Sequence, residues 1–208
     1  NYLMNWLIDH FKNFSKKKGI TDFTGKYNYF DLLSRIKKYN KIIDKKISEG
    51  ETVAILSDYN FYSISLFLSL LNKKCITVPI VSKQAKEIEK RLETASVDKA
   101  IKIDLKGDLS IKNYKKKKSD LKEKLIIKKR AGLILFSSGS TGEPKAMIHD
   151  LDNMIETFKK KKPKNINILV FLMFDHIGGL NTLLNALSMG AHIVLPSNRK
   201  VSVIGKII

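Results

Sequence analysis

The residues best suited to chemistry lie in one short polar segment, SSGSTGEPK, which follows an apolar run that predicts a buried strand. Glycines permit positive φ and a close approach of the backbone, so successive N–H groups can converge on an anion. The hydroxyls add donors, and the lysine adds a full positive charge. A triphosphate is therefore the favoured guest, although ordinary polar turns use the same residue types. The candidate phosphate-binding residues are Ser137, Ser138, Gly139, Ser140, Thr141, Gly142 and Lys145.

The order of this segment differs from two common nucleotide-binding patterns. A Walker A loop needs GxxxxGK[ST], but Gly139 and Gly142 are too close together and Lys145 is not followed by Ser or Thr. The GxGxxG pattern of dinucleotide-binding folds is not matched either. Residues 146–148 predict a short strand, and Asp150 is typical of a helix cap. We expect strand, loop, strand and helix in that order, with the anion held by loop amides rather than by a helix dipole.

A second group of candidate residues has the sequence FDHIGG, residues 174–179, at a predicted strand-to-helix junction. His176 has the side chain best suited to proton transfer or polar contact, and the two glycines after Ile177 allow a close approach. A histidine at such a junction is more often a structural hydrogen-bonding residue. We expect structural roles for the remaining residues with reactive or ligating side chains, which are His10, His149, His192 and the single cysteine, Cys75. No set of metal ligands is expected.

Hydrophobic periodicity predicts the elements that position these groups. Apolar residues at helical spacing predict a leading helix that stops near Gly19 and a second helix over 30–47. An alternation of strands and helices follows, with strands at 52–56, 75–78 and 99–103 and helices at 61–71 and 83–94, the latter capped by Ser82. Further on we expect strands at 131–136, 166–173 and 192–195, and helices at 151–160 and 177–189. This rhythm predicts an α/β fold with a largely parallel sheet flanked by helices.

The composition limits the classes of function. Hydrophobic residues make up 43% of the 208 residues, which excludes wholesale disorder. The net charge of +19 favours a nucleic-acid-binding protein, but only four of the 39 basic residues are arginines, which such surfaces usually recruit. We therefore interpret the lysine runs as solvated faces and expect no nucleic-acid partner. The sequence shows neither a secretory signal nor an apolar stretch long enough to span a bilayer, so a cytoplasmic protein is expected.

The polar segment and the strand before it resemble the signature loop of the adenylate-forming (AMP-binding) superfamily, which includes acyl-CoA synthetases, adenylation domains of peptide synthetases and luciferases. Ala146 and Leu151 depart from the family pattern, which commonly has glycine and often histidine there. Three further stretches are similar to the family: the strand-helix-strand unit from Gly50 to Pro79, the helix at 87–96, and residues 174–180. The resemblance extends from about Lys26 to Pro196.

This resemblance implies an ATP-dependent acid–thiol ligase of the acyl-CoA synthetase type. A carboxylic acid attacks the α-phosphate of ATP to give acyl-AMP and pyrophosphate, and a thiol then takes the acyl group. The expected cofactors are ATP and Mg²⁺, with CoA or the phosphopantetheine of an acyl carrier protein as acceptor and fatty acid metabolism as one setting. The segment at 137–145 would hold the leaving phosphates. The acyl pocket would include Asp175, His176, Gly178 and Gly179, and His176 is the candidate catalytic residue.

The resemblance covers only the first part of such an enzyme, and we interpret residues 1–208 as an incomplete N-terminal AMP-binding domain. The sequence lacks recognisable counterparts of the adenine segment, the ribose-binding aspartate and the adenylation lysine, so the chain alone is expected to be inactive. A catalytically inactive nucleotide-binding remnant is the first alternative, and a basic nucleic-acid-binding protein is the second. The expected parts are a leading helix at 1–22, a first βαβαβ subregion at 23–103, a lysine-rich surface excursion at 104–130, and a phosphate-loop and acyl-pocket subregion at 131–208.

Overall fold

Six strands form the larger of two sheets in the computed structural model, which describes residues 4–115, 120–138, 143–197 and 199, apart from the side chains of Leu121 and Ser138. The strand order is β6-β5-β3-β4-β7-β8. The four inner strands are parallel, and each edge strand is antiparallel to its neighbour. The strands are β3 (Thr52–Ile55), β4 (Ile76–Pro79), β5 (Lys99–Ile103), β6 (Leu109–Asn113), β7 (Gly132–Ser138) and β8 (Pro144–Asp150).

The second sheet joins segments from the two ends of the described chain, in the order β2-β1-β10-β9. Ile20 of β1 pairs in parallel with Ile193 of β10, and β2 is antiparallel to β1. The strands are β1 (Lys18–Asp22), β2 (Gly25–Asn28), β9 (Asn167–Leu169) and β10 (His192–Val194). The predicted α/β fold with mostly parallel strands is therefore confirmed, but the strands are divided between two sheets.

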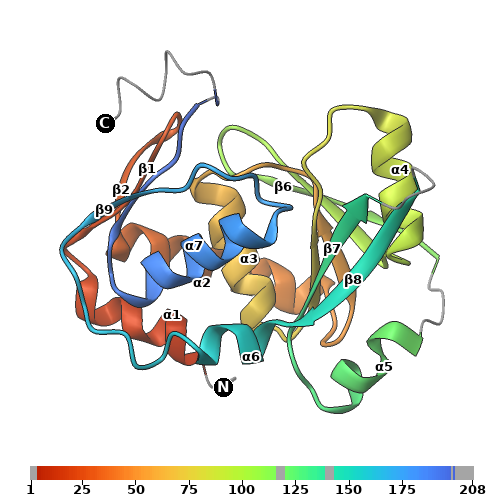
Figure 1. Cartoon of the computed structure of the whole chain (residues 1–208), viewed down its shortest axis with the longest axis horizontal. Coiled ribbons are helices and arrows are strands. Elements are labelled where there is room, and N and C mark those ends of the chain that lie inside the picture. The colour runs from red at the N-terminus through yellow and green to blue at the C-terminus, as the bar shows by residue number, and fades with distance from the viewer. Residues whose placement is uncertain (1–3, 116–119, 139–142, 198, 200–208) are drawn as a thin grey trace.

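Three helices lie between the two sheets and supply much of the main core (Figure 1). They are α2 (Tyr29–Lys46), α3 (Phe61–Asn72) and α7 (Ile177–Ser188). Both α2 and α3 begin with a capping box, in which Asn28 and Asn60 accept from the amide three residues later. Helix α4 (Ala85–Thr94) covers the opposite face of the larger sheet, where a second apolar cluster includes Ile134 and Leu92. No helix in the described residues is both long and apolar enough to cross a membrane.

The predicted leading helix at 1–22 is wrong in its second half. The described residues form a short helix α1 (Trp6–His10) and one 3₁₀ turn η1 (Phe11–Phe14), and the chain then enters β1. Besides the adjacent β2, β1 pairs with β10, more than 170 residues away in the sequence. Local periodicity carries no information about such a distant pairing, which is why the strand was missed.

The segment at 104–130, predicted as a surface excursion, is mostly exposed in its described residues, but much of it has regular structure that was not predicted. Strand β6 extends the larger sheet at its edge, and helix α5 (Asp120–Ile127) packs back onto the molecule. Lys122 in α5 is only 4% exposed, and its ammonium donates to Thr52 Oγ1 at 2.9 Å and to the Ser96 carbonyl at 2.7 Å. A buried ammonium must find acceptors inside the protein. This lysine anchors α5 at the amino end of β3.

Several predicted boundaries are too generous. Helix α6 (Leu151–Glu156) ends before the run of lysines at 159–162, where like charges and the following Pro163 disfavour a helix. The strand predicted at 166–173 has only the three residues of β9. Helix α4 begins at Ala85, and Ser82 does not cap it but donates from Oγ to Glu87 at 2.6 Å.

Candidate functional site

The β7–β8 hairpin carries the predicted phosphate segment. Residues 139–142 lie outside the described residues, but the two strands that flank them are in register, with Ser137 opposite Lys145. Lys145 is exposed. A strand, and not a helix, follows the loop, and Asp150 then caps α6 by accepting from the Asn153 amide at 2.9 Å. The predicted order of strand, loop, strand and helix is confirmed.

The two faces of this hairpin differ in burial. Ile134 and Ile148 pack in the cluster beneath α4, whereas Leu135 on the opposite face belongs to the main core. Its partner across the strands is Met147, which is 43% exposed. Side chains alternate along a strand, so Lys145 and Met147 share this second face. The core therefore opens to the surface beside the phosphate segment.

His149, two residues further along the same face, was predicted to be structural. It is half-buried, and burial lowers the pKa of its imidazole. In the described part of the chain its Nε2 has no hydrogen-bond partner. A neutral ring is what such a site stabilises. Burial of the His149 ring accounts for its lowered pKa, so the structural role predicted for this residue needs no ligand.

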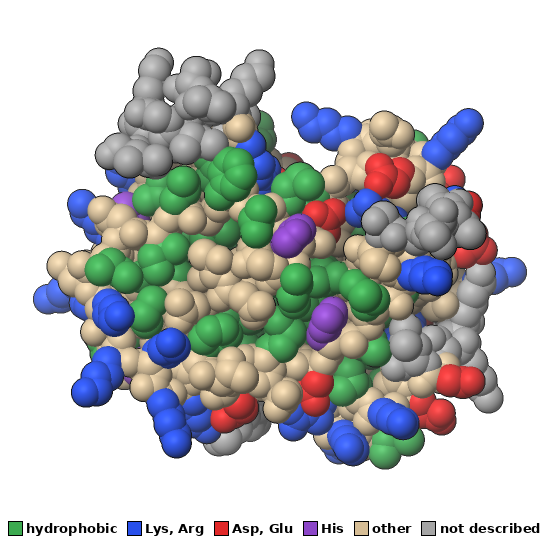
Figure 2. All heavy atoms as spheres, in the orientation of Figure 1, with side chains coloured by type: hydrophobic (Ala, Val, Ile, Leu, Met, Phe, Trp, Pro, Cys, Tyr) green, Lys and Arg blue, Asp and Glu red, His purple; other side chains and the backbone are tan. Residues whose placement is uncertain are grey.

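The second candidate segment leads from β9 into α7 over an exposed apolar surface. Three consecutive side chains are 39–44% exposed: Phe171, Leu172 and Met173. His176 is the N-cap residue of α7, where its Nδ1 accepts from the Gly178 amide at 3.1 Å, and its ring is exposed. Figure 2 shows hydrophobic side chains on the face that carries α7 and β8, with lysines toward the rim. An apolar surface beside an exposed imidazole suits a ligand with an apolar body and a polar end.

The two glycines after His176 have different surroundings. A Cβ on Gly179 would lie 2.8 Å from the Met173 carbonyl oxygen and 3.0 Å from that of Leu172, which is closer than real contacts allow. A Cβ on Gly178 would lie 2.8 Å from the flexible end of the Leu172 side chain and 3.3 Å from His176 Nδ1. The close approach at Gly179 is therefore made by the protein's own backbone. Whether either glycine also contacts a substrate stays a prediction.

Asp175 belongs to the second candidate segment, and its side chain is only 11% exposed. Its Oδ2 accepts from the Val81 amide at 3.1 Å and from Arg91 Nη1 at 3.0 Å. Arg91 also donates to Glu87 at 2.6 Å and lies over the Phe136 ring, 5.4 Å from its centroid. Sequence reasoning missed Arg91. Its rarity as one of four arginines among 39 basic residues was the signal that could have identified it.

A second ion pair holds the start of the same loop. Asp58 follows β3 and accepts from the Phe174 amide at 3.1 Å, while its other oxygen accepts from Arg199 at 2.7 Å. Arg199 also donates to the Phe171 carbonyl at 2.6 Å. The Tyr59 ring packs on Phe174 at 4.6 Å, and burial raises the pKa of the Tyr59 hydroxyl, with the nearby Asp58 charge adding to the effect.

These contacts gather the candidate residues at one edge of the larger sheet. The loops after β3 and β4 both contact the loop before α7, through Asp58 and Val81. Arg91 of α4 joins the same loop to Phe136 near the carboxyl end of β7. Open α/β sheets commonly bind ligands outside the carboxyl ends of their parallel strands. In the described residues no group of three or more His, Cys, Asp or Glu side chains could hold a metal ion.

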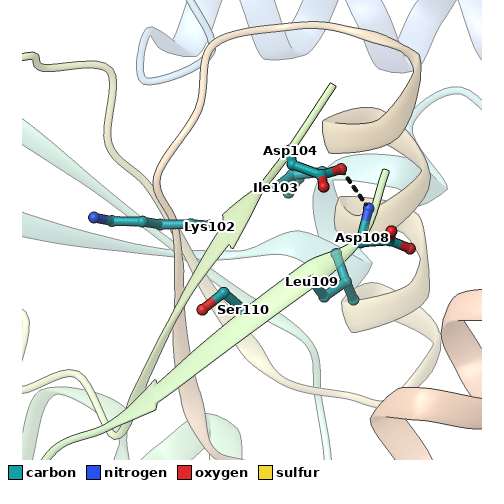
Figure 3. A pocket seen from close by; sticks show the side chains of 6 residues that line it. All are labelled: Lys102, Ile103, Asp104, Asp108, Leu109 and Ser110. Carbon is teal, nitrogen blue, oxygen red and sulfur yellow. Dashed lines mark hydrogen bonds between the residues drawn. The ribbon is translucent and has the colours of Figure 1, made fainter. Parts of the chain in front are cut away.

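A separate hollow of about 240 Å³ lies beside the turn between β5 and β6, on the side of the larger sheet away from the β7–β8 hairpin (Figure 3). Asp104 Oδ1 accepts there from the amides of Lys106 and Asp108, each at 2.8 Å, and the Asp108 amide is the main reason that the pKa of the Asp104 carboxyl is lowered. This carboxylate closes the turn. Strands β3 and β4 lie between the β5–β6 pair and the β7–β8 hairpin, so the hollow is not part of the candidate site.

A family model described as AMP-binding enzyme matches residues 9–206. A search of curated proteins found no match. Many solved structures share the fold.

The N-terminal subdomain of NpsA from Klebsiella oxytoca, in complex with 3-hydroxyanthranilyl-AMSN, has a TM-score of 0.77 at 17% identity and matches 96% of this chain and 55% of its own. The N-terminal domain of FACL13 from Mycobacterium tuberculosis gives 0.76 at 13% identity, covering 98% and 59%. O-succinylbenzoate CoA synthetase (MenE) from Bacillus subtilis, in complex with AMP, gives 0.72 at 16% identity, covering 98% and 58%. At these identities the likeness establishes the fold, and the chain spans little more than half the length of these structures.

Proposed function

The chain belongs to the AMP-binding enzyme family, and from this premise we propose that it provides the phosphate-binding and acid-facing part of a ligase that activates a carboxylic acid as acyl-AMP. The observation that carries the proposal is the meeting of two segments at one sheet edge. The β7–β8 hairpin brings Ser137 and Lys145 together, and the loop that ends at His176 is joined to that hairpin through Arg91.

The phosphate side of the proposed reaction rests on Lys145 and on the segment at 137–142. In the reaction a carboxylate oxygen forms a bond to the α-phosphorus while the bond to the pyrophosphate oxygen breaks. Charge develops on the departing pyrophosphate, and an exposed ammonium beside a glycine-rich turn is suited to neutralise it. The chain's described residues offer no ready-made metal site, so a Mg²⁺ ion would be held mainly by the phosphates and water.

The acid side of the proposal rests on the apolar surface at 171–173 and on His176. The apolar side chains would contact the body of the acid, and the exposed imidazole would lie near its carboxylate or near the incoming thiol. His176 Nδ1 already accepts from the Gly178 amide, which leaves Nε2 to face a ligand. We also propose that the acyl group passes to a thiol, either of CoA or of a carrier protein.

We propose that the 208-residue chain binds nucleotide without completing acyl-AMP formation by itself, because its sequence has no recognisable adenine segment or adenylation lysine. The test compares the affinities of AMP and of hydrolysis-resistant acyl-adenylate analogues, measured by calorimetry, over a panel of aliphatic and aromatic acids. At least one analogue should bind about tenfold more tightly than AMP, which corresponds to about 1.4 kcal/mol from acid contacts.

The outcomes of this test are distinct. If no analogue binds more tightly than AMP, the acid-facing role is wrong. Binding of neither AMP nor MgATP would contradict the nucleotide-binding role altogether. Acid-dependent exchange of pyrophosphate into ATP by this chain would show that its residues complete the reaction, contrary to the proposal. Replacing His176 with Ala should remove most of the gain from the acyl group and leave the affinity for AMP unchanged within about twofold.

A further inference from the structure

Arg91 contacts two segments that belong to different halves of the proposed site. Its Nη1 donates to Asp175 at 3.0 Å, and its guanidinium carbon lies 5.4 Å from the centroid of the Phe136 ring. Phe136 immediately precedes Ser137, and Asp175 immediately precedes His176. One side chain therefore touches both the residue before the phosphate segment and the residue before the acid-side histidine.

The guanidinium is held in place from its own helix. Glu87, one turn earlier in α4, accepts from Arg91 Nη2 at 2.6 Å, and Ser82 donates to the other oxygen of Glu87 at 2.6 Å. The Arg91 side chain is 21% exposed. A planar guanidinium can donate to two carboxylates while its face covers an aromatic ring, whereas a lysine ammonium is a compact charge that cannot reproduce this geometry.

Asp175 depends on this contact more than Glu87 does. The Asp175 side chain is 11% exposed against 40% for Glu87, and among the described residues the Val81 amide is the other donor to Asp175. Without the guanidinium, a mostly buried carboxylate would keep a single neutral donor, which is an unfavourable state. The loop must then shift toward water, and His176 shifts with it.

We infer that Arg91 is a positioning residue that fixes the loop at 174–176 against the carboxyl end of β7. Arg91 makes these contacts without any ligand. Their effect on acyl-AMP formation rests on the proposed function. In that reaction the acid and the α-phosphate must meet in line, so an error of about 1 Å between the two segments would lower the rate about 100-fold. The alternative is that Arg91 only stabilises helix α4.

Amide hydrogen exchange on the 208-residue chain separates the two roles. In Arg91→Met, amides at 136–137 and 174–176 should exchange at least about tenfold faster than in the unaltered chain, while amides of β3 and β4 change by less than about twofold. Lys86→Met removes an exposed charge from the same helix and should leave both segments unchanged. Leu92→Ala removes a buried side chain next to Arg91 and destabilises α4 without touching Asp175.

The comparison with Leu92→Ala decides the outcome. If Arg91→Met accelerates exchange at the two segments no more than Leu92→Ala does, Arg91 is merely structural and the inference is overturned. Arg91→Lys provides a milder change in case the methionine variant does not fold. It keeps the charge and loses the planar geometry, so it should accelerate exchange at both segments by an intermediate factor; exchange equal to that of the unaltered chain would also overturn the inference.

Two further exchange experiments test the pairing of Arg91 with Asp175 and the response to MgATP. Because Asp175→Asn removes the buried charge, adding Arg91→Met to it should accelerate exchange at 174–176 no further, and an additive effect would contradict the pairing. MgATP bound at the hairpin should slow exchange at 174–176 in the unaltered chain, and this protection should be lost in Arg91→Met even at saturating MgATP. Failure of MgATP to bind at all counts against the proposed function, while the arms without ligand still test Arg91.

Discussion

The two ends of the larger sheet place positive charge in opposite settings. At the amino end, Lys122 is buried and donates to Thr52 and Ser96, so its charge is used to hold α5 on the sheet. At the carboxyl end, Lys145 is exposed beside the phosphate segment. Two lysines of the same strongly basic chain therefore have different roles, and burial with internal acceptors distinguishes a lysine that holds the fold from one that can meet a ligand.

The arginines of the chain are distinguished from its many lysines by their specific contacts. Each of the four has a specific contact: Arg91 and Arg199 with the loop before α7, Arg130 with Asp150 at 2.5 Å, and Arg35 over the Tyr62 ring at 4.9 Å. Lysine can supply net charge at any surface position, but the planar fork is needed where two acceptors or a ring must be met together. In a chain dominated by lysine, arginine marks the positions where geometry matters.

The largest expected effect is at the amino end. Replacing Lys122 with Ala should lower the free energy of unfolding by about 2–3 kcal/mol, because it opens a gap and leaves two acceptors without their charged donor. Urea denaturation measures this value. Lys124→Ala, at an exposed position of the same helix, should change it by less than about 0.5 kcal/mol. Equal effects of the two substitutions would remove the distinction between the ends of the sheet.

A smaller loss of stability is expected where α7 meets the loop before it. Gly179→Ala should lower the free energy of unfolding by about 1–3 kcal/mol, because the new methyl group would press on two backbone carbonyls that cannot move independently. Gly178→Ala is the matched control, since the atoms nearest to its methyl group belong to the side chains of Leu172 and His176 and not to the backbone. If Gly178→Ala proves the more destabilising, the packing described for Gly179 is wrong.

The smallest expected effect is a change in pH dependence from His149. Burial lowers its pKa in the folded state below the ordinary value of 6.5, so on acidification the unfolded chain takes up the proton first. Stability should therefore fall as the pH drops below about 6.5. His149→Gln should flatten part of this slope, measured by urea denaturation between pH 7.5 and 5, and His192 accounts for another part because its pKa is also lowered by burial. An unchanged slope in His149→Gln would show that its ring is not desolvated.

The sequence was informative where structure is local. The strand-loop-strand order around 137–148 and the helix start at Ile177 follow from residue type and spacing, and both are confirmed. What could not be predicted depends on distant partners. Strand β1 is defined by pairing with β10, and Lys122 is buried only because Thr52 and Ser96 offer acceptors. The role of Asp175 likewise depends on Arg91, 84 residues earlier.

The central claim is that the β7–β8 hairpin binds the phosphates of a nucleotide through Lys145. Titration of MgATP at 0.15 M salt, with the unaltered chain and with Lys145→Ala, tests it most directly. Because this lysine is exposed, its removal should weaken binding by about tenfold, or about 1.4 kcal/mol, which is less than the loss typical of a charge-stabilising group in a dry site. Lys161→Ala, at an exposed position within the lysine run after α6, should change the affinity by less than about twofold. Equal loss in both variants, or competition by nonspecific duplex DNA that is insensitive to Lys145→Ala, would contradict the claim and favour general attraction by the lysine-rich surface.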